Sequence, residues 1–160
     1  MEPNEILKHI QSGLEAKAKA AELRQAQIAQ AAKDFSEIQA KVQSETKTLR
    51  DGLAELGVNL EIDTQPKGEE PNRETLSVDA EFENLRRSLR FLLEPDGTRI
   101  EVRIYSDGGG ESESAVKLIS VNSNAYREIM EQVDDFLSEL VGIPRTPKRA
   151  EHIRKICIRE

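Results

Sequence analysis

The amino-acid sequence predicts an α+β protein: a long N-terminal α-helical coiled-coil stalk, then a small antiparallel β-meander covered by one or two C-terminal helices. Three observations predict this fold class. Strong helix formers fill the first 57 residues, the hydrophobic period then changes from seven to two, and helical spacing returns near residue 125. We therefore expect a stalk at residues 1–57, an acidic domain of sheet plus helix at 58–144, and a basic C-terminal helix or tail at 145–160.

The stalk has the composition of one continuous helix. No Pro or Gly occurs between Leu14 and Asp51, and Ala, Gln, Glu, Lys and Arg dominate. These residues lose little side-chain entropy on a helix. Pro3 or Asn4 suits its first turn, and Gly57 suits the position just after its end. A helix of about 50 residues is about 75 Å long, so much of it must project from a domain of about 90 residues.

A row of apolar residues recurs every seven positions along the stalk. Such a row would drift by about 20° per heptad on a straight helix, so it predicts supercoiling around a partner. If the row occupies the d positions, the a positions, which include Gln39 and Thr46, are all uncharged, whereas the other register buries three charges. The residues that we expect to carry oligomerisation are Leu14, Ile28, Phe35, Val42, Leu49 and Leu56.

A parallel homodimer is the pairing that the stalk sequence favours. In that arrangement Lys17 faces Glu22 and Glu45 faces Arg50 on the other chain, and both pairs attract. Two alternatives remain open: pairing with a different coiled-coil chain, and folding of the stripe back onto the acidic domain. Assembly through this row predicts that changing Phe35 and Val42 to Asp dissociates the complex and leaves the acidic domain folded.

Alternating apolar and polar residues predict the sheet. The Pro95–Asp96–Gly97 turn sits between two such runs, because Pro presets the turn dihedral and Gly accepts a left-handed conformation. We expect the outer face of this hairpin to carry cross-strand ion pairs among Arg90, Arg99, Glu101 and Arg103. The expected strands cover residues 58–62, 76–82, 89–93, 100–104 and 114–121.

A helix follows the last strand and covers the sheet. Ser123 or Asn124 is a suitable N-cap, and Gly142 ends the helix. Its buried stripe is expected to consist of Ile129, Val133, Phe136, Leu137 and Leu140. Thr146 and Pro147 resemble the cap and first position of a further short helix.

Charge and cysteine content limit the partners. Residues 58–144 carry 9 basic and 19 acidic side chains, which repel nucleic acids and anionic membranes and favour a basic protein partner.

The longest apolar runs are too short to span a membrane, and the first residues do not resemble a secretion signal. One cysteine, Cys157, is typical of a reducing compartment, so we expect a cytoplasmic protein.

The sequence offers no convincing catalytic or metal-binding pattern. Residues 107–111 form an acid-flanked glycine run that is more typical of a hairpin loop than of a phosphate cradle, with a weak cation site as the alternative. His152 and Cys157 are five residues apart, about 140° around a helix, so they do not converge. His9 is far from both in the sequence. We therefore expect no enzymatic activity, no cofactor and no metal.

The basic end of the chain is the best-localised charge feature. It lacks the aromatic residues that stack on bases, so it can equally neutralise the chain's own acidic helix or contact a partner. The candidate residues for a contact with a protein partner or with nucleic acid are Arg145, Lys148, Arg149, Arg154, Lys155 and Arg159.

Together these features predict a non-enzymatic protein-interaction and oligomerisation module, in which a coiled-coil stalk presents an acidic α+β binding domain. The alternative is a nucleic-acid-associated or inhibitory protein. It would act through the basic tail or through an acidic domain that imitates DNA. Salt dependence separates the two, because phosphate-type binding weakens steeply with ionic strength.

Overall fold

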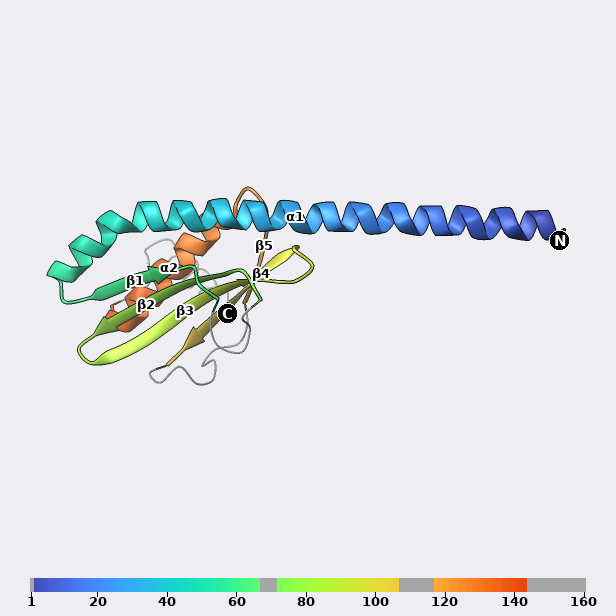
Figure 1. The fold of residues 1–160 in the computed structure, drawn as a ribbon. Coiled ribbons are helices and arrows are strands. Elements are labelled where there is room, and N and C mark those ends of the chain that lie inside the picture. Colours follow the sequence, from blue (N-terminus) through green and yellow to red (C-terminus); the bar gives the residue numbers. More distant parts are fainter. Residues whose placement is uncertain (1, 67–71, 107–116, 144–160) are drawn as a thin grey trace, which may run out of the picture.

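The computed structural model describes residues 2–66, 72–106 and 117–143, and it confirms the α+β class. A five-stranded sheet lies between two helices in the sequence, and its strand order follows the chain, β1-β2-β3-β4-β5, with antiparallel neighbours throughout (Figure 1). The elements are α1 Pro3–Glu55, β1 Asn59–Asp63, β2 Thr75–Phe82, β3 Leu85–Leu93, β4 Arg99–Tyr105, β5 Lys117–Ser120 and α2 Ala125–Val141. We call the sheet together with α2 the head.

Helix α1 has the limits that the sequence predicts. At its start, Glu2 and Glu5 form a reciprocal capping box and Pro3 occupies the first turn. At its end, Gly57 adopts a left-handed conformation with φ of +87°. With 53 residues α1 is about 80 Å long. Its second half lies along the head, and its first half, residues 3–27, projects as an arm (Figure 1).

Two tight turns set the register of the central strands. The Pro95–Gly97 turn forms as predicted, with Gly97 at φ of +74° and its N–H donating to the Glu94 carbonyl at 2.8 Å. The turn between β2 and β3 was not predicted. Glu83 and Asn84 both have positive φ, which is the two-residue geometry that matches strand twist. Strand β3 therefore begins at Leu85, four residues before the Leu89 that we expected.

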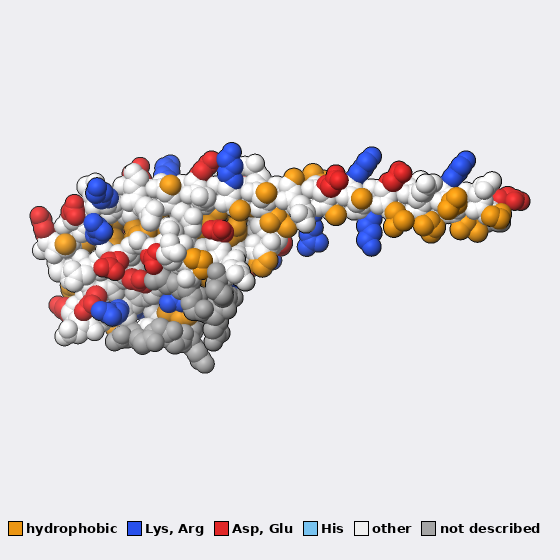
Figure 2. Space-filling model, viewed as in Figure 1, with side chains coloured by type: hydrophobic (Ala, Val, Ile, Leu, Met, Phe, Trp, Pro, Cys, Tyr) orange, Lys and Arg blue, Asp and Glu red, His pale blue; other side chains and the backbone are white. Residues whose placement is uncertain are grey.

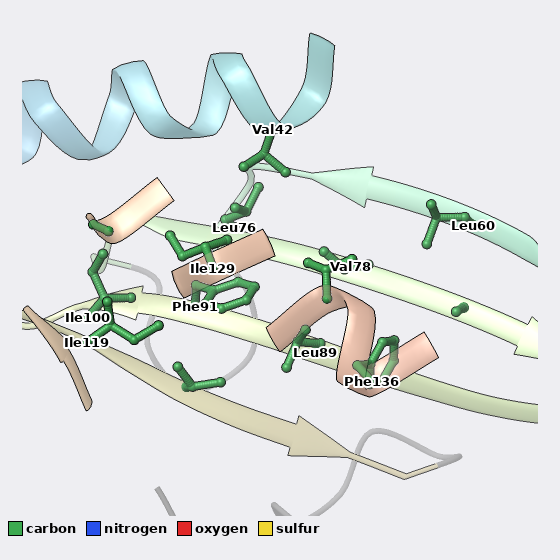
Figure 3. Close-up of a cluster of buried hydrophobic side chains, with 14 of the residues drawn as sticks. Val42, Leu60, Leu76, Val78, Leu89, Phe91, Ile100, Ile119, Ile129 and Phe136 are labelled. Carbon is green, nitrogen blue, oxygen red and sulfur yellow. The ribbon is translucent and has the colours of Figure 1, made fainter. Parts of the chain in front are cut away.

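The core lies on one face of the sheet. Alternate residues of the strands point to this face, and α2 lays its apolar stripe across it (Figure 3). The stripe of α2 is the predicted one, except that Leu137 is only half-buried. The largest buried side chains of the sheet are Leu76, Val78, Leu89, Phe91, Ile100 and Ile119.

Helix α1 completes this core, and this finding corrects the coiled-coil interpretation. Phe35 and Val42, which we expected to face a second chain, are both 0% exposed and belong to the same cluster as the inner face of the sheet. Gln39 is buried with them, and its Nε2 donates to the Thr75 carbonyl at 2.7 Å. Helix α2 contacts β2, β3 and β5, and helix α1 contacts β1. The two helices therefore cover different parts of the same face of the sheet. The core thus crosses the boundary that we expected at residue 57.

Candidate interaction surfaces

The arm carries an uncovered apolar patch. Ile6, Leu7, Ile10 and Leu14 are 48%, 64%, 54% and 61% exposed. Their spacing places them on one face of the helix. Figure 2 shows apolar side chains along the lower edge of the projecting helix. We call these four residues the arm patch.

The arm patch and the head occupy the same side of α1. At about 100° per residue, Ile6 and Ile10 lie within about 20° of Phe35, which packs on the head. Leu14 and Leu7 lie about 60° and 80° from Phe35. The space-filling view agrees, because the apolar edge of the arm faces the side on which the head lies (Figure 2). The side of α1 that the head covers in the second half therefore continues into the arm, where none of the described residues covers it.

A second apolar surface lies where α1 and α2 end. It is a groove of about 500 Å³ whose exposed lining is mostly apolar. We call it the helix groove. Asp134 and Ser138 are its polar members. The apolar lining residues are Leu49, Leu53, Leu56, Val58, Phe82, Met130, Val133, Leu137, Val141 and Ile143.

The helix that forms one wall of this groove is strongly acidic. Helix α2 carries five acidic side chains and one basic side chain, Arg127. Of the acidic residues, Glu131, Asp134 and Glu139 are exposed. Only Asp134 of these lines the groove, so a partner that enters it meets a mostly apolar surface with one acidic side chain, which favours the apolar face of a helix.

A polar cleft of about 690 Å³ lies between the end of α1 and the outer face of the sheet. Arginine and carboxylate side chains alternate along it, including Arg86 and Glu81, whose side chains pair at 3.1 Å. Nearby, the Arg90 guanidinium lies 4.1 Å from the centre of the Tyr105 ring. With opposite charges this closely mixed, the cleft has no strong preference for an anion or a cation.

The outer face of the sheet also holds a half-buried charge cluster. Arg73 and Arg103 contact the two oxygens of Glu101 at 2.9 Å and 2.7 Å. Burial alone would raise the pKa of Glu101, but the hydrogen bonds from Arg73 and Arg103 outweigh it and hold that pKa below its ordinary value. The ion pairing differs from the predicted cross-strand pairs, because Glu101 and Arg103 pair within β4. Arg90 lies opposite Arg103, and Arg99 contacts Glu94.

No family model, curated protein or solved structure matches the chain. Within the described ranges, no group of three His, Cys, Asp or Glu side chains could hold a metal ion. Nor is any helix in the described part both long and apolar enough to cross a membrane.

The six residues predicted to oligomerise do not form one surface. Leu14 belongs to the arm patch, and Ile28 is half-buried at the edge of the head. Phe35 and Val42 are inside the core, and Leu49 and Leu56 line the helix groove. The six basic residues of 145–160, the glycine run at 107–111, His152 and Cys157 lie outside the described residues.

Sequence reasoning missed the α2 side of the helix groove. Met130 and Val141 lie with Leu137 of the predicted stripe at helical spacing and widen the apolar face of α2. A helix that only covered a sheet would not need this wider apolar face. The width of the stripe was thus a signal in the sequence that a further element packs there.

Proposed function

We propose that this chain is a non-enzymatic protein-interaction module that assembles with a second copy through the arm. The observation that carries the proposal is the arm patch, in which four large aliphatic side chains lie next to one another without a covering element among the described residues. Burying one such side chain contributes about 1.5–3 kcal/mol. Four of them can therefore drive association, and the head would be brought along with the arm.

The length of the arm supports the same proposal. Most helical stability in proteins comes from packing an amphipathic face and not from intrinsic propensity. The arm makes no such packing contact with the described part of the head, although its sequence keeps an amphipathic pattern. A partner helix would supply the missing contact.

Sedimentation equilibrium of the whole chain tests the proposal. We expect a dimer for the unaltered protein at high micromolar concentration and a monomer for the double variant Leu7→Gln, Leu14→Gln. Leu23→Gln is the matched control. Leu23 is 62% exposed, like Leu7 and Leu14, but it lies about 180° around the helix from Leu14.

Each outcome decides the proposal. A monomer for the unaltered protein would overturn self-assembly. A dimer that survives the double variant would place the contact away from the arm patch. If Leu23→Gln dissociates the dimer as much as the double variant does, loss of apolar surface anywhere on the arm would weaken the dimer. That result would contradict a contact through one face of the helix.

A further inference from the structure

We infer that the arm patch of one molecule occupies the helix groove of a second copy, so that two chains exchange arms in an antiparallel dimer with two-fold symmetry. This inference rests on the proposed function and goes beyond it. It names the receiving surface and the orientation of the two chains, and the orientation is the opposite of the parallel pairing that the stalk sequence alone favours.

The position of the head argues against parallel arms. The head and the arm patch lie on the same side of α1. If two parallel arms faced each other through their patches, each head would extend into the space that the other head occupies. An antiparallel arrangement places each head beside the arm of the partner, and no such conflict arises.

The spacing along α1 fits the antiparallel arrangement. When Leu7 lies beside Leu56 of the second copy, Leu14 lies beside its Leu49, because both pairs share the same midpoint in the sequence. That midpoint falls between Ala31 and Ala32, at the place where α1 meets the tip of the β3–β4 hairpin. Apart from this hairpin tip, which also contacts Ile28, each head then lies on one side of the symmetry axis, and the arm patch lies on the other.

The chemistry of the two surfaces is complementary. The helix groove is apolar along its floor and α2 is acidic, with five acidic residues and one basic residue. The arm, residues 3–27, carries four basic residues and three acidic ones, so its net charge is +1 against −4 for α2. An amphipathic helix with an apolar face is the kind of ligand that such a groove accepts. A symmetric dimer fills two grooves with two arms.

Disulfide trapping tests the orientation. In a background with Cys157→Ser, chains that carry Leu7→Cys are mixed with differently tagged chains that carry Leu56→Cys, and the mixture is oxidised. Arm exchange predicts mixed disulfide dimers as the main product. Dominant dimers of two Leu7→Cys chains would indicate parallel arms and overturn the inference, although the proposed function would stand. A monomeric unaltered protein would overturn both.

A variant in the groove tests the receiving surface. Leu56→Arg changes a side chain that is 73% exposed, so the fold should tolerate it. We expect it to raise the dissociation constant of the dimer about tenfold or more. Leu118→Arg is the matched control on β5, at the opposite edge of the sheet from β1, and should leave the constant unchanged. An unchanged constant for Leu56→Arg overturns the inference, and it is the result expected if residues 144–160 or an unrelated protein fill the groove.

Discussion

Gly97 at the tip of the β3–β4 hairpin contacts Ala31 of α1 so closely that a Cβ on Gly97 would lie 2.9 Å from the Ala31 Cβ. The same Cβ would lie 3.2 Å from the Ile28 Cα. The hairpin tip therefore meets the helix backbone where the arm begins. This contact defines the end of the covered part of α1, and it depends on a residue without a side chain.

Gly97→Ala is expected to destabilise the fold by about 2–4 kcal/mol. One part of the loss is the strain of a side chain at a φ of +74°, and the other is the clash with Ala31 and the helix backbone. Urea denaturation followed by circular dichroism measures the free energy of unfolding. Gly57→Ala is the matched control, because Gly57 has a φ of +87° but no atom within 4 Å of its Cβ position. Equal losses in the two variants would contradict a close contact at Gly97.

Gln39→Met is expected to cost about 1–3 kcal/mol of stability. The substitution keeps the length of the side chain but removes the hydrogen bond from Nε2 to the Thr75 carbonyl, and this carbonyl is deeply buried. The exposed Gln43→Met is the control and should be nearly neutral. If both variants unfold at the same urea concentration, the buried hydrogen bond does not contribute to stability.

The elements of this fold could be predicted where one local signal decides the structure. The limits of α1 follow from Pro3 and Gly57, and the β3–β4 hairpin follows from Pro95 and Gly97. The Glu83–Asn84 turn was missed because Glu is an unusual residue at positive φ. The alternation of apolar residues up to Phe82 indicates a strand, but it does not indicate that the chain reverses at Glu83 and Asn84.

The partner of the heptad row could not be predicted, because a row of apolar residues reports which face is buried and not what buries it. The face was correct, since Phe35, Gln39, Val42 and Thr46 all point to one side and are buried. The covering element was wrong for these four residues. They pack against the sheet, whose strands begin 13 residues after Thr46, and helix periodicity contains no information about those strands.

The stability of the fold should fall in acid partly through Glu101. Its pKa lies below the ordinary value of 4.5 because the hydrogen bonds from Arg73 and Arg103 outweigh the effect of burial. Its contribution is thus fully present above about pH 4.5 and is lost as the pH falls through the lower folded-state pKa. Glu101→Gln should flatten the loss of stability below pH 5, measured by urea denaturation across pH 3–7.

A double-mutant cycle with Arg73→Gln checks the cause. If the Arg73–Glu101 contact at 2.9 Å depresses the pKa, Arg73→Gln should weaken the acid dependence of a protein with Glu101 and have little further effect in Glu101→Gln. Additive effects of the two substitutions at pH 7 would contradict coupling between these side chains.

The division of the heptad row into a core half and an assembly half gives the last prediction. Phe35→Ala should destabilise the head by about 3–5 kcal/mol, because it leaves a cavity between α1 and the sheet. Leu14→Ala should change the stability of the monomer by less than about 0.5 kcal/mol but weaken the dimer. Urea denaturation at protein concentrations below the dimer dissociation constant measures the first effect, and sedimentation at concentrations above it measures the second.

The earlier expectation that changing Phe35 and Val42 to Asp would leave the acidic domain folded is thus reversed. A folded monomeric Phe35→Asp, Val42→Asp variant would show that this half of the helix faces a partner after all.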